Sequence, residues 1–191
     1  MNLSQIKVAV VQGVGPVGAF AIMYLAQMGV PEVIAVSSGK NKSREDLAKK
    51  LGATEVLTFR DMTEDELISY VSSKNGGLGA DLVYEASGSP NAVPQGMAML
   101  RNRGLYLIPG QYSFRGNVEI PPHMITFKAI RLIGSSQYSM SDVHDYIKFL
   151  EEHPAVHPCI NELIARYKVS DVNKAFDDAK AGKNVKTVLV K

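Results

Sequence analysis

The chain lacks several features that would by themselves define a class of protein. Its 191 residues include a single cysteine, Cys159, so no internal disulfide can form and nothing points to secretion. The formal net charge is only +2 and no long run of like charges occurs, so neither nucleic acid nor a membrane surface is an expected partner. Charged or polar residues interrupt every apolar run before it nears a membrane-spanning length. With no signal-peptide pattern at the N-terminus, we expect a cytoplasmic globular protein of one domain, or one domain with an appendage.

The strongest pattern in the sequence lies between Lys7 and Gly29. It begins with Val8–Val11, an apolar and mostly β-branched run that suits a strand buried on both faces. Gly13, Gly15 and Gly18 follow with the spacing G-x-G-x-x-G, and apolar residues then recur at helical intervals. Strand, glycine turn and helix together are the context that the dinucleotide-binding fingerprint requires.

Each glycine of this turn has a physical role in such a site. Gly13 permits the tight turn, Gly15 leaves the backbone open to a pyrophosphate, and Gly18 lets the helix pack against the strand. Free N–H groups at the helix N-terminus then face the anion. The motif alone leaves open that this is a glycine-rich turn without a ligand.

Strand and helix patterns alternate along the first two thirds of the chain. One expected helix follows Gly18, two open with capping-box spacing at Ser43 and Thr63, and one runs after Pro90 to about Asn102. Such alternation predicts an α/β fold with a doubly wound parallel sheet, strand order 3-2-1-4-5-6, and ligands at the carboxyl ends of the strands. The expected strands are residues 8–11, 32–36, 55–59, 81–86, 104–108 and 130–134.

The pattern changes after Phe114. We expect a dinucleotide-binding domain over residues 1–138 and a C-terminal helix and strand appendage over residues 139–191. The expected elements here are extended segments at 116–122 and 161–167, helices at 141–152 and 170–181, and a last strand at 186–190.

Four segments of the chain resemble the zinc-type alcohol dehydrogenases of the medium-chain dehydrogenase/reductase family. They are VVQGVGPVG, DLVYEASGSP, GLYLIPG and the closing KVSDVNKAFDDAKAGKNVKTVLV, and GVGPVG is the zinc-type form of the fingerprint. The resemblance runs from about Lys7 to the C-terminus. It implies a Rossmann domain and an oxidoreductase that transfers a hydride between a nicotinamide cofactor and an alcohol or carbonyl substrate.

The same resemblance implies contacts with each part of the cofactor. Lys186 falls where the family often has an arginine that reaches the phosphates, and a solvated lysine is the alternative. The implied contacts are Gly15, Pro16 and Val17 at the pyrophosphate, Ala86, Ser87 and Gly88 on the adenosine side, Pro109, Gly110 and Gln111 beside the nicotinamide, and Ser135 and Ser136 near its amide.

The end of the second expected strand favours NADP(H), with NAD(H) left open. NAD enzymes place an acidic residue there, about 20 residues past the glycines, to hold the ribose 2′-OH. Ser37 and Ser38 stand in that place, and Lys42 follows closely. A carboxylate would repel a 2′-phosphate, whereas hydroxyls and cations attract one. The alternative is a polar loop whose lysines are only solvated.

The resemblance also limits what this chain is expected to do alone. In the family, a catalytic body that precedes the fingerprint supplies the ligands of a catalytic zinc, and this chain starts at the fingerprint. Cys159 and the 4 histidines are not in ligand spacing, and prolines interrupt the segment from His153 to His157. We therefore expect no catalytic residue, no zinc and no alcohol dehydrogenase activity in this chain by itself.

Two other functions stay open at this stage. The first is a stand-alone NADP(H)-binding or sensing module without catalysis. The second is an S-adenosylmethionine-dependent methyltransferase, which would need an acidic residue where Ser37 stands.

The assembly prediction concerns the sixth strand, residues 130–134. It is apolar and expected at the edge of the sheet, so it predicts a homodimer joined edge to edge, as in the family. A monomer whose edge is covered by residues 114–127 is the alternative.

Overall fold

A computed structural model describes residues 3–191. The chain forms two compact units, and their boundary in the sequence lies between Ser136 and Gln137. The first unit is built on a six-stranded parallel sheet with the order β3-β2-β1-β4-β5-β6, which confirms the predicted order. Its strands are β1 Val8–Gln12, β2 Glu32–Ser37, β3 Glu55–Thr58, β4 Ala80–Glu85, β5 Leu100–Ile108 and β6 Arg131–Gly134.

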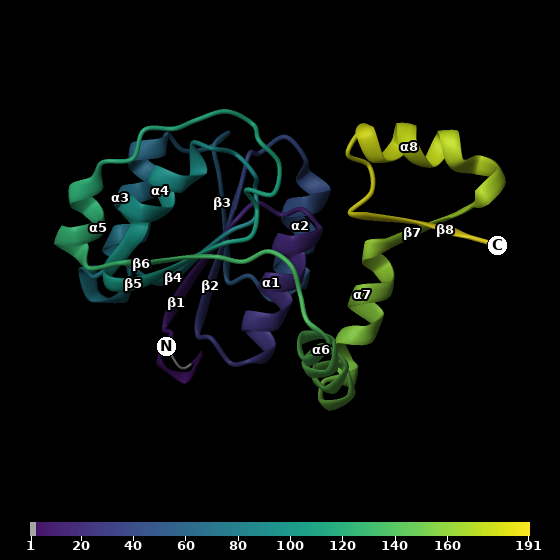
Figure 1. Cartoon of the computed structure of the whole chain (residues 1–191), viewed down its shortest axis with the longest axis horizontal. Coiled ribbons are helices and arrows are strands. Elements are labelled where there is room, and N and C mark those ends of the chain that lie inside the picture. Colours follow the sequence, from purple (N-terminus) through teal and green to yellow (C-terminus); the bar gives the residue numbers. More distant parts are fainter. Residues whose placement is uncertain (1–2) are drawn as a thin grey trace. The chain divides into compact units, whose positions relative to one another are not determined.

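Helices cover both faces of this sheet. In Figure 1, α1 and α2 lie on one face, and α3, α4 and α5 lie on the other. This covering explains why β1 is buried along its whole length and consists almost entirely of apolar residues. The helices are α1 Pro16–Gln27, α2 Lys42–Lys50, α3 Glu64–Gly77, α4 Ala92–Met99 and α5 Pro122–Lys128, and a 3-10 turn, Leu3–Gln5, precedes β1.

The boundary between α4 and β5 differs from the sequence prediction. The helix expected to reach Asn102 ends at Met99, and β5 begins at Leu100 rather than at residue 104. Leu100 pairs with Ala80 of β4 and is buried, so its apolar side chain serves the sheet instead of the helix. A register shift between this pair and the pairing of Leu82 then absorbs the extra residues of β5.

The start of α2 also differs from the prediction. Its N-cap is Asn41, whose side chain accepts a hydrogen bond from the Arg44 N–H at 3.3 Å, so the capping box expected at Ser43 is wrong. The capping box expected at Thr63 is confirmed, because Thr63 and Glu66 exchange side-chain and backbone hydrogen bonds at the start of α3.

Helix α5 was not predicted. The segment expected to be extended over residues 116–122 has no helix or strand up to residue 121, and its last residue begins α5. Lys128, in the last turn of α5, attaches this helix to the end of α4 and the start of β5. The Lys128 Nζ donates to the carbonyl oxygens of Met97, Ala98 and Leu100 at 3.1, 2.8 and 2.9 Å. A cation thus lies at the C-terminal end of α4, where the helix dipole favours positive charge.

The second unit contains α6 Met140–Glu152, α7 His157–Leu163, β7 Ile164–Lys168, α8 Val172–Lys180 and β8 Lys186–Val190, with 3-10 turns at Pro154–Val156 and Val169–Asp171. Strands β7 and β8 form a parallel pair, and α8 is the crossover between them (Figure 1). The extended segment expected over 161–167 is wrong for its first three residues, which belong to α7. Among the described helices of both units, none has the length and apolar character needed to cross a membrane.

Candidate cofactor-binding site

The glycine turn between β1 and α1 lies at the carboxyl end of β1, against the loop that follows β4. Gly13 has φ +95°, and a Cβ on it would approach the Ser87 Cα to 2.8 Å. A Cβ on Gly18 would overlap the Gly13 carbonyl oxygen. Gly15 differs, since a Cβ there would meet no atom within 4 Å. Gly13 and Gly18 are therefore required by packing, whereas Gly15 faces open space.

The first turn of α1 is left without a side-chain cap. Gly15 is the N-cap residue and makes no side-chain hydrogen bond, and Pro16 follows at the first helical position, where its missing N–H costs nothing. The next side chain, Val17, is 47% exposed. The open backbone at Gly15 and the uncapped N-terminus of α1 together form a surface suited to an anion.

Glu85, the last residue of β4, organises the neighbouring loops. Its side chain is fully buried, at 0% exposure. One carboxylate oxygen, Oε1, accepts hydrogen bonds from the Ser87 N–H at 2.7 Å, the Ser87 hydroxyl at 2.6 Å and the Gly88 N–H at 2.9 Å. The other, Oε2, accepts from Gln111 Nε2 at 3.1 Å. A single carboxylate thus joins the loop after β4 to the loop after β5.

Close packing of the backbone tightens the same junction. The Gly110 N–H donates to the Glu85 carbonyl oxygen at 2.9 Å, and the Ala86 N–H donates to that of Gln12 at 2.8 Å. A Cβ on Gly110 would overlap the Glu85 carboxylate, so only glycine fits there. The loops after β1, β4 and β5 are therefore one connected surface, which also carries Pro109 just before Gly110.

A buried hydroxyl, that of Tyr106, connects β5 to β1 and α4 by hydrogen bonds. The Tyr106 hydroxyl lies 2.8 Å from Gln12 Oε1 and 2.9 Å from the Ala92 carbonyl oxygen, and Gln12 Nε2 donates to the same carbonyl at 2.8 Å. Burial, with the charge of Glu85 adding to it, raises the pKa of Tyr106 well above its usual value. The hydroxyl therefore stays protonated and can act as a donor.

The predicted ribose contacts lie at the end of β2. Ser37 is buried, and its Oγ accepts from the Gly39 N–H at 3.2 Å, while the exposed Ser38 accepts from the Lys40 N–H at 3.4 Å. Lys42 lies 3.5 Å from the Glu45 Oε2. The hydroxyls therefore shape the loop through local hydrogen bonds, and the Lys42 ammonium already has a carboxylate beside it.

Sequence reasoning missed Arg60, which lies in the turn that follows the adjacent strand β3. Its guanidinium donates to the Gly39 carbonyl oxygen at 3.0 Å, to both Glu45 oxygens at 3.2 and 3.3 Å, and to both Asp61 oxygens at 3.0 and 2.8 Å. Hydrogen bonds to Arg60 lower the pKa of Asp61 to about 2, so both groups are charged at neutral pH. Arg60 thereby fixes the loop after β2 to the loop after β3.

The other predicted contact residues lie after β6 and at the start of β8. Ser135 and Ser136 follow β6, and the Ser135 N–H donates to the Ile108 carbonyl oxygen at 3.3 Å, so this serine lies beside the end of β5. Lys186 is the exposed first residue of β8, in the second unit, and the structure locates it within that unit only. Among the described residues, no group of three or more His, Cys, Asp or Glu is placed to hold a metal ion.

The sheet order and the glycine turn at the carboxyl edge define a Rossmann-type domain. Residues 16–152 match the family described as zinc-binding dehydrogenase. The chain belongs to that family, which confirms the resemblance.

Relatives and solved structures agree on the extent of the match. The chain is 31% identical over 180 residues to 5-exo-hydroxycamphor dehydrogenase of Pseudomonas putida, covering 94% of this chain and 49% of that protein. It is 30% identical over 190 residues to D-xylulose reductase A of Aspergillus oryzae, covering 98% and 51%. The chain thus spans about half the length of the curated relatives it matches.

The solved structures extend the comparison to the fold. An alcohol dehydrogenase from Thermotoga maritima superposes with a TM-score of 0.87 at 25% identity, over 96% of this chain and 49% of that one. A Sinorhizobium meliloti protein whose structure was solved bound to NADP has a TM-score of 0.81 at 22% identity, over 97% and 52%. At 22% identity, the similarity to the Sinorhizobium meliloti protein shows a shared fold.

Proposed function

We propose that this chain is the nicotinamide-dinucleotide-binding part of a zinc-type alcohol dehydrogenase. One observation carries the proposal: Gly15, open on its outer side, lies at the uncapped N-terminus of α1 and at the carboxyl edge of a parallel sheet. That place suits a pyrophosphate, because a backbone without Cβ and free N–H groups can approach its oxygens. When bound, the nicotinamide cofactor supplies or accepts the hydride, and a catalytic domain would hold the alcohol or carbonyl substrate.

The residues at the start of α1 fit the pyrophosphate of such a cofactor. Gly15, Pro16 and Val17 would hold the pyrophosphate, and the loops joined by Glu85 would line the adenosine and nicotinamide sides. The membership in the dehydrogenase family and the NADP bound by the Sinorhizobium meliloti protein support a nicotinamide cofactor over other nucleotides.

We propose further that the cofactor is NADP(H) rather than NAD(H). Strand β2 ends in Ser37, which presents a hydroxyl where an NAD enzyme presents a carboxylate. We expect NADPH to bind more tightly than NADH, and we expect Ser37→Asp to reverse that order, because the new carboxylate would repel the 2′-phosphate and accept the ribose 2′-OH. Dissociation constants of the wild type and the variant, measured by calorimetry at fixed salt, test this.

The control for this substitution is Ser73→Asp, on the exposed surface of α3. It introduces the same charge outside the site and should leave the ratio of the two dissociation constants unchanged. Binding of NADH by the wild type that is as tight as, or tighter than, binding of NADPH would overturn the proposed preference.

We also propose a homodimer formed through β6. This strand is the end member of the sheet, pairs with β5 on one side, and carries Ile133 at 46% exposure. Two copies joined edge to edge would satisfy the unpaired N–H and C=O groups of both strands in one continuous sheet. Such a dimer would have to accommodate the exposed, charged side chain of Arg131 in the same strand.

The test uses Ile133→Lys, because Ile133 is exposed whereas Leu132 packs on the core. Two added lysines facing each other near the two-fold axis should convert the dimer into a monomer. Sedimentation at micromolar concentration measures this, with Ile120→Lys on the connection after β5 as the matched control. A wild-type chain that sediments as a monomer would contradict the proposal.

A further inference from the structure

The loop after β2 lies beside a compact network of charges from α2 and the loop after β3. Glu45 is its centre, since its carboxylate is only 2% exposed and contacts both Arg60 and Lys42. Asp46 and Asp61 complete the network at 3.4 Å from Lys42 and 2.8 Å from Arg60. The network therefore holds two cations and three carboxylates.

The cations of this network have little left to offer a ligand. An arginine has five N–H donors, and Arg60 uses them on the Gly39 carbonyl, Glu45 and Asp61. Lys42 lies between two carboxylates of its own helix, Glu45 and Asp46. The positive charges of Lys42 and Arg60 are thus directed toward acidic side chains of the protein.

The position of the network relative to β2 follows from hydrogen bonds and register. Ser37 pairs with Thr58 of β3, and the Phe59 N–H donates to the Ser37 carbonyl oxygen at 3.1 Å. Gly39 joins the two, because its N–H donates to Ser37 and its carbonyl accepts from Arg60. The network is therefore adjacent to the residues that end β2.

We propose that Glu45 is a specificity-determining residue that limits the preference for NADP(H). It acts through Lys42 and Arg60, and so as a positioning residue. It holds both cations at α2 and the loop after β3, and it adds negative charge beside the ribose. This inference rests on the proposed nicotinamide-cofactor function. Its distinctive consequence is that an acidic residue of the helix after β2 changes the ratio of the two affinities, in addition to the residue that ends β2.

The test is Glu45→Gln, which keeps the shape of the side chain and removes its charge. We expect NADPH and 2′,5′-ADP to bind about fivefold more tightly, since a partly exposed ion pair is worth about 1 kcal/mol. NADH and 5′-AMP, which lack the 2′-phosphate, should keep their affinities within about a factor of two. A general loosening of the fold would weaken all four ligands and therefore cannot produce this pattern.

Two further variants sharpen the result. Adding Arg60→Gln to Glu45→Gln should remove most of the gain for NADPH, because the released cation is then absent. Glu55→Gln is the matched control, since Glu55 pairs with Lys74 at the opposite end of β3 and its loss should not change the ratio.

The outcomes separate this inference from the proposed function. If the wild type binds either dinucleotide and Glu45→Gln has the same ratio of NADPH to NADH affinity as the wild type, the role of Glu45 is overturned and the proposed function is not. A wild-type chain that binds neither would overturn the proposed function and the inference together. If Glu45→Gln fails to fold, Lys42→Gln decides instead. Because Glu45 holds this cation away from the ligand, NADPH affinity should then change by less than about a factor of two, and a larger loss would overturn the inference.

Discussion

A Gly15→Ala chain is expected to fold as stably as the wild type and to bind NADPH at least about tenfold more weakly, a loss of about 1.4 kcal/mol. The backbone of Gly15, at φ −81° and ψ −172°, is one that alanine adopts freely, and the added Cβ meets no atom within 4 Å. Alanine is the poorer N-cap residue, but the entropy it removes from the unfolded chain offsets that loss. The methyl group would instead stand where the pyrophosphate approaches the backbone.

The measurements are thermal unfolding for stability and calorimetry for binding, and Gly18→Ala is the contrasting variant. There the Cβ would overlap the Gly13 carbonyl oxygen, which is backbone and cannot move aside cheaply. Gly18→Ala should therefore unfold at clearly lower temperature, whereas Gly15→Ala should not. Unchanged NADPH affinity in Gly15→Ala would show that the cofactor lies elsewhere.

The second large effect is expected on removing the Glu85 carboxylate. Glu85→Ala should lower the free energy of unfolding by about 3 kcal/mol, because the partly buried donors of the loops after β4 and β5 lose their acceptor and a fully buried side chain leaves a cavity. It should also weaken NADPH binding, since the two loops it joins would no longer hold one arrangement. Urea unfolding and calorimetry measure the two quantities.

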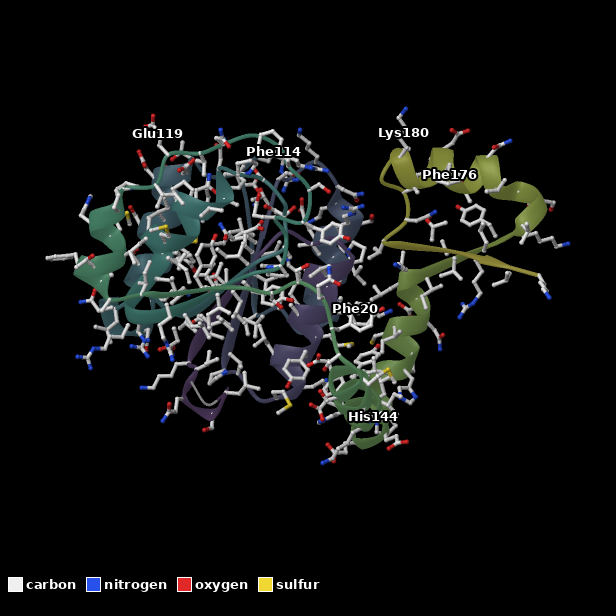
Figure 2. All side chains as sticks on the ribbon, viewed as in Figure 1. Phe20, Phe114, Glu119, His144, Phe176 and Lys180 are labelled. Atoms are coloured by element: carbon white, nitrogen blue, oxygen red, sulfur yellow. The ribbon has the colours of Figure 1, made fainter. Side chains whose placement is uncertain are left out.

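Glu85→Gln separates shape from charge. The amide keeps one acceptor oxygen for the Ser87 and Gly88 N–H groups but presents an NH₂ group to Gln111, so an intermediate loss of stability is expected. Glu119→Ala, at an exposed position labelled in Figure 2, is the control and should change neither quantity. A Glu85→Ala chain as stable as this control would refute the joining role of the carboxylate.

Elements with a strong local pattern were predictable from the sequence alone. The glycine turn, the buried strands and the capping box at Thr63 depend on neighbours in the chain, so periodicity and turn chemistry identify them. The start of β5 was not predictable in this way. Leu100 continues a helical pattern, and only its pairing with Ala80, 20 residues away, makes it a strand residue.

The charged residues of the site were missed for a similar reason. Glu85, Glu45 and Arg60 are ordinary acidic and basic residues in the sequence, and their roles come from contacts across separate strands and loops. A signal was available for Glu85, since an acid that ends a buried strand and precedes a Ser-Gly turn can accept the N–H groups of that turn. No comparable pattern connects Arg60 with Glu45, which lie 15 residues apart in the sequence.

The segment between β5 and β6, which includes α5, is fastened near both of its ends. Gln111 binds the carbonyl oxygen of Ser89 and the Glu85 carboxylate at one end, and Lys128 binds three carbonyl oxygens of the α4 terminus at the other. Between these anchors the chain is largely exposed, with Phe114, shown in Figure 2, at 86%. Each doubling of a flexible loop's length adds only about 0.6 kcal/mol of closure cost. A fused peptide, a label or a longer natural loop can therefore be accommodated in this connection at little expense to the sheet.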